Sequence, residues 1–483
     1  MRQIIQTDTA INRKKKVVME VVLLAVCLLF YLLFPFFDGP VWCADSASYA
    51  FMDISREPLY PAFLALTRIR GAGNAAEEDA YIVTVILQSL LAGFSAWYAG
   101  FVIKRTKDQS TLLQIAAIVF QFAVVLLCRF AAVRGSVYTD CIMTEGLGLS
   151  LFVLFILELY LYVAGGRKCH LLWTLILSFL LISLRKQMMI TILIMGAVFG
   201  WYILIRNRKV RKFLCLMLLM VSVLAACKVT DRLYNYAVRG VWIEHCHNSM
   251  GVLCTLLYSS DAEKDKLLFT DETVKELYLE IMKQADEQKL LYAYAQGDWL
   301  SMSSHYADSY DAIGYGIINP VVDGYIAGHY DYTIVEAALK YDEICEEMTR
   351  TLFKQNLMPM LQVYCYNVLK GLVNSVARAG HLLSIYAAAA YLGFAAAAGY
   401  LILQKKKLKE MEMQIERSLA FAFIVMMGIV INSLVVGLII FTQPRYMIYS
   451  MGLFYAAYAM LLYDVVRCHI LLHGKKTSVC TGM

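Results

Sequence analysis

Long runs of apolar residues alternate with short polar segments along most of this chain. About ten of these runs approach the length of about 20 residues that a helix needs to cross a bilayer. The pattern predicts an all-α polytopic membrane protein with about ten transmembrane helices. The runs are 17–37, 80–103, 111–130, 141–164, 170–184, 187–205, 212–229, 381–403, 418–441 and 446–466.

Residues 170–205 favour two crossings of the membrane rather than one. A single helix would extend about 54 Å and carry positive charge at both ends. As two helices, the first reaches only about 22 Å, so the turn at Arg185, Lys186 and Gln187 is expected below the outer membrane surface. A charged turn at that depth is tolerated beside a protein-lined or water-filled cavity. We therefore expect an outward-facing cleft at this turn.

Lys and Arg residues cluster before the first run and after each even-numbered run. Because cytoplasmic loops carry an excess of these residues, both termini are predicted to be cytoplasmic in a multi-pass protein of the cell membrane. The basic clusters are 13–16, 104–107, 167–168, 206–212, 405–409 and 467–476.

Residues 230–380 break the hydrophobic pattern and carry about half of the acidic residues of the chain. They lie between the seventh and eighth runs and are expected to form an extracytoplasmic, mainly helical domain. The predicted organisation is a transmembrane module over 1–229 with a first outer loop over 38–79, this domain, and a second transmembrane module with a cytoplasmic tail over 381–483.

Helical spacing of apolar residues recurs inside this domain. One helix is expected to begin after Asp271 or the residue before it and to end at Gly297, and a second covers 335–352. Pro359 stands where a third helix begins, which we expect to continue into the eighth run. The tyrosine-rich stretch 292–332 is predicted to be an ordered loop, either a cover over the membrane surface or a surface that stacks on a polar ring.

The composition agrees with this class of protein. Apolar residues make up 60% of the chain and charged residues 17%, with a mean hydropathy of +0.59, whereas soluble domains run at about 45–50% and about 25%. An ordinary soluble enzyme is therefore excluded. The net charge of +6 is spread over short runs between apolar segments, so it reports orientation and predicts no nucleic-acid partner.

Motifs for cofactors are missing from the sequence. The 13 cysteines include no CxxC pair and no zinc-like spacing, and there is no GxGxxG, Walker A or Asp-x-Asp pattern. Glu244-His245-Cys246-His247 offers metal-ligand types, but adjacent residues rarely converge on one ion. No metal site or cofactor is predicted, and a requirement for a divalent cation stays open.

The first outer loop contains the first candidates for chemistry, Asp45 and Arg56. A carboxylate at the lower end of the cleft would accept a proton from a hydroxyl if it lies within hydrogen-bond distance. The alternative is that Asp45 is a solvated acid or a partner for Arg56. Asp38 is a weaker candidate base, because Asp-Gly-Pro is typical of a turn.

Glu145 lies about one turn inside an apolar run. An unpaired ion costs about 2.5–3.5 kcal/mol at mid-membrane and less near its edge, so a polar partner is expected. Arg129, Arg134 and Arg185 are the candidates, and both a structural ion pair and a binding role stay open.

The last outer turn places Arg445 and Tyr446 at the outer interface. A guanidinium suits a phosphate because its planar fork bonds two oxygens at once and stays charged. The alternative is an arginine that anchors the helix end at the interface.

The order of these segments resembles that of the C-type integral-membrane glycosyltransferases, called GT-C. Within that group the chain is similar to polyprenyl-phosphate-sugar-dependent enzymes such as protein mannosyltransferases and lipid A aminoarabinose transferases. The likeness covers 17–205 and 381–466. It rests on Asp45-Ser-Ala-Ser-Tyr49, Arg56-Glu-Pro-Leu-Tyr-Pro61, Thr144-Glu145, Leu184-Arg185-Lys186-Gln187 and Arg445-Tyr446.

The resemblance implies a GT-C-like fold and a polyprenyl-phosphate-linked sugar as donor. It also implies an extracytoplasmic glycan, lipid or protein of the cell envelope as acceptor. Asp45 would be the base, and one direct displacement would invert the anomeric carbon. Lys186 stands where the family often has proline, and Ser46 where mannosyltransferases have an acid, so the sugar and acceptor stay open. The residues implied to bind the substrate or its lipid phosphate are Arg56, Glu145, Arg185, Lys186, Gln187, Arg445 and Tyr446.

Other functions are compatible with about ten spans and buried ions. A transporter or lipid flippase is the main alternative, although the sequence has no repeated halves and no proline in the middle of a span. A polysaccharide polymerase or ligase of the envelope and a non-catalytic assembly partner are further alternatives.

Overall fold

The chain is helical almost throughout in a computed structural model, which describes residues 2–69, 77–107, 109–129, 135–206 and 208–480. Within these ranges there is no strand, and one isolated bridge joins Val41 to Cys141. Eight helices of the described part are long and apolar enough to cross a membrane. The prediction of an all-α polytopic membrane protein is confirmed.

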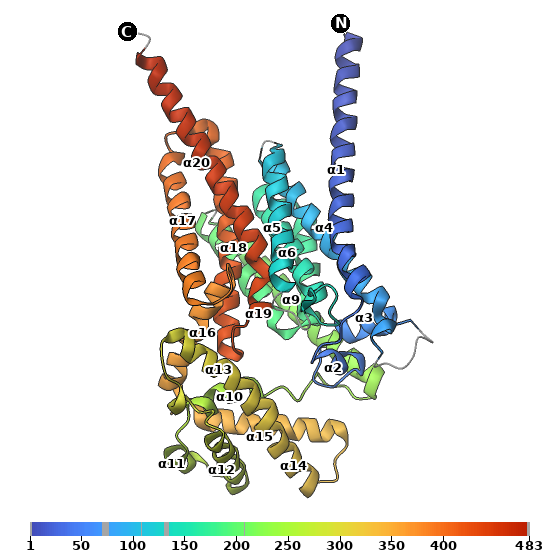
Figure 1. Cartoon of the computed structure of the whole chain (residues 1–483), viewed down its shortest axis with the longest axis vertical. Helices are drawn as coiled ribbons and strands as arrows, with labels where there is room; N and C mark the ends of the chain where they lie inside the picture. The colour runs from blue at the N-terminus through green and yellow to red at the C-terminus, as the bar shows by residue number, and fades with distance from the viewer. Residues whose placement is uncertain (1, 70–76, 108, 130–134, 207, 481–483) are drawn as a thin grey trace.

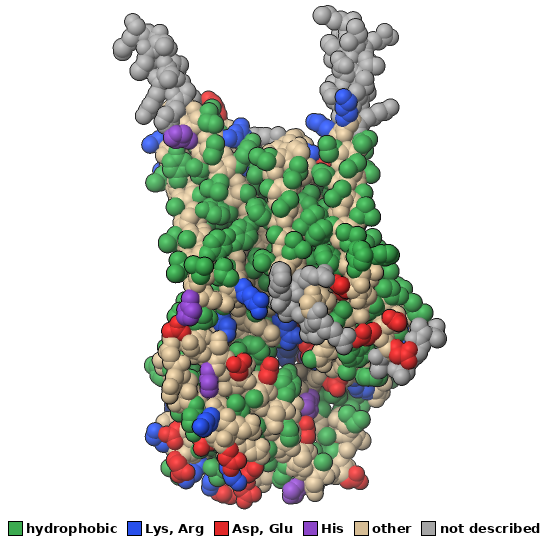
Figure 2. Space-filling view, viewed as in Figure 1, with side chains coloured by type: hydrophobic (Ala, Val, Ile, Leu, Met, Phe, Trp, Pro, Cys, Tyr) green, Lys and Arg blue, Asp and Glu red, His purple; other side chains and the backbone are tan. Residues whose placement is uncertain are grey.

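An apolar helix stands at the position of each predicted run, and two of them, α5 and α7, fall short of the length of the other eight. Hydrophobic side chains gather around this bundle, while charged side chains gather beyond its two ends (Figure 2). The helices are α1 (Arg2–Asp38), α4 (Ile82–Thr106), α5 (Thr111–Arg129), α6 (Glu145–Gly165), α7 (Lys168–Leu184), α8 (Ile190–Phe199) continuous with η3 (Lys186–Met189) and η4 (Gly200–Arg206), α9 (Val210–Arg239), α17 (His381–Lys405), α18 (Glu412–Ile439) and α20 (Met451–Cys480).

The helix α9 extends ten residues beyond the predicted run 212–229. Hydropathy marks where a chain leaves the hydrocarbon layer, whereas the helix itself ends where its backbone is capped. Gly240 provides that cap, with a φ of +75° that only glycine adopts freely.

A second group of helices, here called the cap domain (250–374), lies at the end of the bundle opposite to both termini (Figure 1). It has its own apolar core, centred on residues such as Leu257, Tyr278, Ile317 and Met348. Its elements are α10 (Met250–Ser259), α11 (Ala262–Asp265), η5 (Lys266–Leu268), α12 (Glu272–Glu287), η6 (Tyr292–Tyr294), α13 (Trp299–Ile313), η7 (Gly314–Ile318), α14 (Asn319–His329), α15 (Ile334–Phe353) and α16 (Leu357–Asn374).

Two of the predicted helices of this domain are found. Asp271 caps α12 by accepting hydrogen bonds from the N–H groups of Thr273 and Val274, and α15 covers the second predicted range. The predicted end of the first helix is wrong. The helix stops at Glu287, where Lys289 turns the chain with a φ of +57°, well before Gly297.

The predicted loop over 292–332 is also wrong, because most of it is helical in α13, η7 and α14. Asp298 starts α13 by accepting a hydrogen bond from the N–H of Ser301, so a residue that suits a loop acts here as a helix cap.

The helix that contains Pro359, α16, does not continue into α17, which differs from the prediction. The side chain of Asn374 bonds to the backbone of Thr442 and Ala379, and the chain leaves the helix at this point.

Glycine allows a close crossing of α1 and α4. A Cβ atom at Gly93 would lie 2.8 Å from the Cα atom of Leu28 and 2.9 Å from the carbonyl oxygen of Cys27. Small residues at such crossings let helix backbones approach in the membrane, where packing rather than the hydrophobic effect holds helices together. The approach of α1 to the bundle therefore depends on the missing side chain of Gly93.

Replacing Gly93 by Leu is expected to lower the midpoint of thermal unfolding of the detergent-purified protein. Overpacking typically costs about 1–3 kcal/mol, and here the obstacle is backbone, which cannot move aside as a side chain does. Gly399→Leu on α17 is the matched control, since a Cβ atom there meets nothing within 4 Å. Equal midpoints for the two variants would contradict this account of the crossing.

Candidate functional site

The loops before α2 (Ser46–Ala50) and α6 are paired side by side. The backbone of Val41 both donates and accepts hydrogen bonds across this bridge. The carbonyl oxygen of Val41 accepts from the N–H of Ile142 at 3.0 Å. The buried amide of Gln88 on α4 donates to the carbonyl oxygens of Thr139 and Cys141, at 2.9 and 3.1 Å. The two loops that precede Asp45 and Glu145 are therefore held against each other.

Ser46 anchors the start of α2. Its hydroxyl donates to the carbonyl oxygen of Ile142 at 2.8 Å and accepts from the N–H of Cys43 at 2.8 Å, and the residue is buried. Asp45 directly precedes this anchor, so its position is fixed by the pairing of the two loops.

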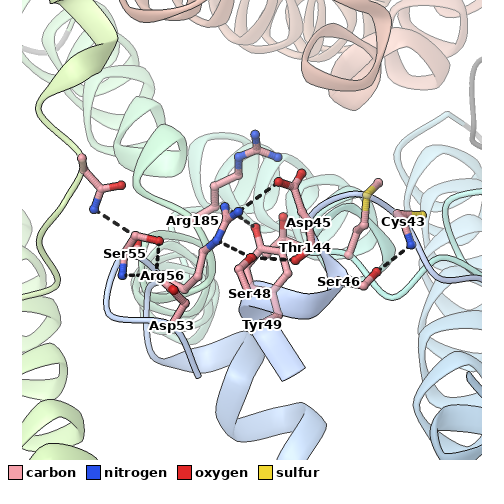
Figure 3. A network of polar contacts seen from close by, with 12 residues as sticks. Cys43, Asp45, Ser46, Ser48, Tyr49, Asp53, Ser55, Arg56, Thr144 and Arg185 are labelled. Atoms are coloured by element: carbon pink, nitrogen blue, oxygen red, sulfur yellow. Dashed lines mark hydrogen bonds and ion pairs between the residues drawn. The ribbon is translucent and has the colours of Figure 1, made fainter. Parts of the chain in front are cut away.

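Two arginines hold the carboxylate of Asp45 (Figure 3 shows the contact with Arg56). Arg56 donates to Oδ1 at 2.9 Å, and Arg445, 400 residues further along the chain, donates to Oδ2 at 3.2 Å. Arg56 is itself oriented by Ser48 and Tyr49, whose oxygen atoms lie 2.8 and 3.3 Å from its nitrogens. Asp45 is thus a partner of Arg56, as one reading of the sequence had it, and of Arg445 as well.

The charges around Asp45 keep it ionised. Burial raises the pKa of this carboxyl group, but the positive charges of Arg445, Arg56 and Arg185 lower it more, so that the pKa lies below its ordinary value. Asp45 is therefore a carboxylate at neutral pH and can accept a proton or a hydrogen bond.

Glu145 forms a second ion pair. Its side chain is 2% exposed, and Oε1 accepts from Nη1 of Arg185 at 2.5 Å while Oε2 accepts from the hydroxyl of Thr144 at 3.2 Å. Of the three arginines considered as partners, the structure thus brings Arg185 to Glu145. Arg134 and the side chain of Arg129 lie outside the described residues.

Tyr446 joins the two ion pairs. The guanidinium carbons of Arg185 and Arg445 lie 4.5 and 4.7 Å from the centre of its ring, and Nη2 of Arg445 donates to its hydroxyl oxygen at 2.5 Å. Such contacts of a cation with an aromatic face are favourable. We call the resulting group the ionic cluster: Asp45, Arg56, Glu145, Arg185, Arg445 and Tyr446.

The remaining candidates lie beside this cluster. Lys186 has an exposed side chain, and its backbone N–H donates to the carboxylate of Glu57. Gln187 donates to the side chain of Asn432 at 3.1 Å and to the carbonyl oxygen of Tyr446 at 3.2 Å. The amide of Gln187 therefore ties the turn to α18 and α19 (Pro444–Met447). Asp38, the alternative base, is the last residue of α1.

The segment between α9 and α10 connects the cap domain to the loop that carries Arg56. Cys246 donates its N–H to the carbonyl oxygen of Ile54, and the side chain of Asn248 donates to the backbone carbonyl oxygen of Ser55. On the other side, the carboxylate of Asp342 on α15 accepts from three successive backbone N–H groups that begin at His247. No sequence pattern indicates these contacts, since each of them involves a backbone group.

The acidic and histidine residues of this segment have separate partners. Glu244 pairs with Arg232, and His245 pairs with Asp231 at 2.5 Å. In the described part of the chain, no group of three His, Cys, Asp or Glu residues is placed to hold a metal ion.

A comparison with models of known protein families and with characterised proteins finds no match for this chain.

The Glu145–Arg185 pair gives a direct test of the cluster. Arg185→Ala is expected to cost about 3–5 kcal/mol of unfolding free energy, because it leaves the buried carboxylate without its cation. Adding Glu145→Gln to that variant should recover part of the loss, measured by SDS titration in mixed micelles. If the two substitutions simply add, the residues are not coupled and the description of the cluster is wrong.

Proposed function

We propose that this chain is a membrane glycosyltransferase that moves a sugar from a polyprenyl-phosphate donor to an acceptor outside the cytoplasm. The observation that carries the proposal is the carboxylate of Asp45 held between Arg56 and Arg445. This arrangement joins a possible base to cations suited to a phosphate, in the segments that resemble the C-type glycosyltransferases. In a multi-pass membrane protein, a lipid-linked donor would reach such a site from the bilayer.

The donor phosphate would bind to the cations of the ionic cluster. Nε of Arg445 is buried and has no hydrogen-bond partner within the described structure, so this guanidinium retains a donor for a ligand. The guanidinium of Arg185 lies over the ring of Tyr446 as well, and the exposed Lys186 follows Arg185 in sequence. Together these residues offer the positive charge that a departing phosphate needs.

Donor binding would also release the base. Each oxygen of Asp45 accepts from one arginine, so losing one of these contacts would raise the pKa of the carboxylate and open that oxygen to an acceptor hydroxyl. A phosphate is a stronger competitor for Arg445 than a single carboxylate oxygen, because it offers a fork of charged oxygens. The donor would therefore bind first, draw Arg445 away and leave Oδ2 for the acceptor.

The chemical step is then a single displacement. The acceptor oxygen attacks the anomeric carbon, and the bond from that carbon to the phosphate oxygen breaks with its electron pair going to the phosphate. Asp45 takes the proton of the acceptor hydroxyl, and the configuration at the anomeric carbon is inverted. Polyprenyl phosphate and the glycosylated acceptor are the products.

The orientation follows from the basic clusters near both termini, which favour a cytoplasmic location for them. The cap domain lies at the other end of the bundle (Figure 1), so the ionic cluster beside it would face the outer leaflet. The acceptor would then be a glycan, lipid or protein of the cell envelope.

Mass spectrometry of envelope glycans from cells with and without the gene tests the proposal. A transferase predicts the loss of one sugar residue from an envelope molecule, together with accumulation of its lipid-linked donor. Loss of a long chain would instead indicate a polymerase or ligase. Ion-coupled flux through the purified protein, with no sugar product, would indicate a transporter and overturn the proposal.

Asp45→Asn is expected to reduce transfer by about 10²–10⁴-fold, since the amide keeps the shape of the side chain but cannot accept the proton. The thermal unfolding midpoint should change little by comparison, because the amide oxygen still accepts from an arginine. Release of polyprenyl phosphate by the detergent-purified protein measures the rate. Full activity of this variant would remove Asp45 from the mechanism.

Arg445→Ala is expected to raise the apparent KM for the donor, with a smaller effect of Arg445→Lys because lysine keeps the charge but not the fork. The pH profile provides a second readout. Without Arg445 the effect of burial on Asp45 is less opposed, so the pKa of Asp45 rises and the acidic fall of the rate moves to higher pH. An unchanged KM and pH profile would leave Arg445 as an interfacial anchor only.

A further inference from the structure

A widened helical turn of the cap domain lies beside the ionic cluster. Between α13 and α14 the chain forms the π-helical turn η7, a rare geometry that is frequent at functional sites. Tyr310, four residues before this turn, donates its hydroxyl to the carbonyl oxygen of Ile439 at 3.1 Å, and its ring lies 5.5 Å from that of Phe441. These contacts fasten the turn to the segment that leads into Arg445.

The turn is also fixed from its other side. A Cβ atom at Gly314 would lie 3.1 Å from Sγ of Cys254 and 3.3 Å from Sδ of Met250. The backbone of η7 is therefore packed closely on α10, while Gly316 on the same turn has open space around it. The side chains near this turn are consequently presented from a rigid support.

Asp311 and Tyr315 are exposed side chains that act electrostatically on the cluster. Both interact with Asp45, Asp311 also with Arg445, and Tyr315 also with Arg56 and Tyr446. Burial, and then the negative charge of Asp45, raise the pKa of Tyr315 to about 12. Tyr315 is nevertheless 57% exposed, so its ring remains open to a ligand.

We propose that Asp311 and Tyr315 form the wall of a sugar-binding subsite next to the ionic cluster. The ring of Tyr315 would stack on the C–H face of a sugar, and the carboxylate of Asp311 would accept a hydrogen bond from a hydroxyl. The inference rests on the proposed function and adds to it the residues that select the sugar. It also gives the cap domain a role in the reaction.

The charges of the wall favour a neutral or cationic ring over an anionic one. Asp311 and Asp45 both present negative charge to this region, and the positive charge of Arg445, which also acts on Asp311, would be taken up by the donor phosphate. A hydroxyl-rich ring donates hydrogen bonds to carboxylates at no charge penalty. The sugar is either that of the donor or the terminal residue of a glycan acceptor, and both share this chemistry.

Saturation-transfer NMR on the full chain in detergent tests the subsite without requiring turnover. The probes are methyl glycosides of glucose, galactose, mannose and N-acetylglucosamine, together with bare polyprenyl phosphate and polyprenyl-phosphate mannose. Tyr315→Ala and Asp311→Asn are the test variants, and Tyr315→Phe retains the ring. Tyr332→Ala and Asp331→Asn are matched controls, since Tyr332 is 42% exposed and Asp331 is an exposed acid of the same domain.

We expect at least one glycoside to bind the wild type, and its affinity to fall about tenfold in Tyr315→Ala and Asp311→Asn. Tyr315→Phe and the two controls should bind as the wild type does. If the donor supplies the sugar, the test variants will also lose the preference for glycosylated over bare lipid. If an acceptor supplies it, that preference will stay and only glycoside binding will weaken.

No glycoside binding by the wild type, or equal binding by all variants, would overturn the subsite. This outcome is separable from failure of the proposed function. Sugar binding that depends on the wall, without any release of polyprenyl phosphate, would refute the transferase and leave the subsite standing. Transfer that is unaffected in Tyr315→Ala and Asp311→Asn would refute the subsite alone.

Discussion

The clamp of two arginines on Asp45 is the interaction on which the rest of the site depends. A half-buried carboxylate beside the membrane must be paired with positive charge, because an isolated charge in such surroundings is costly. Arg56 comes from the same loop, whereas Arg445 comes from α19, the short helix that precedes the last apolar helix. The pairing therefore requires that the first outer loop and the segment before the last apolar helix come together at one end of the bundle.

The neighbouring contacts extend this constraint to the other parts of the protein. The paired loops before α2 and α6 hold Asp45 near Glu145, and Tyr446 places its ring against the arginines of both ion pairs. The segment between α9 and α10 fastens the cap domain to the loop of Arg56. A movement of the Arg56 loop on substrate binding would consequently be transmitted to the cap domain through these hydrogen bonds to backbone groups.

The sequence predicted the apolar helices well and the cap domain only in part. Hydrophobic runs specify where helices cross a membrane, because side chains in the hydrocarbon layer must be apolar and the backbone there must form its own hydrogen bonds. In the cap domain, Asp298 and the tyrosines around it suited a loop equally well as a helix start, and tertiary packing decided for the helix. The end of α12 was misplaced for a similar reason, since Lys289 adopts the left-handed turn that glycine was expected to supply.

For the site, charged residues next to apolar runs were informative because the cost of burial demands a partner. The cost of burial pointed to Glu145 and to the turn at Arg185 without choosing among the arginines for Glu145, whereas Asp45 and Arg445 were selected by their places in the outer loops. The family resemblance also assigned Gln187 to the substrate, and in the structure its amide donates to Asn432 and to the backbone of Tyr446. Asp311 and Tyr315 could not be found in this way, because an exposed residue of a soluble-like domain leaves no mark in the hydrophobic pattern.

An experimental structure of the chain with a polyprenyl-phosphate sugar bound would test the central claim most directly. We expect the lipid phosphate within hydrogen-bond distance of the Arg445 guanidinium, with Asp45 still held by Arg56 and its other oxygen free to meet an acceptor hydroxyl beside the anomeric carbon. A phosphate bound elsewhere, with the contact between Asp45 and Arg445 intact, would contradict it.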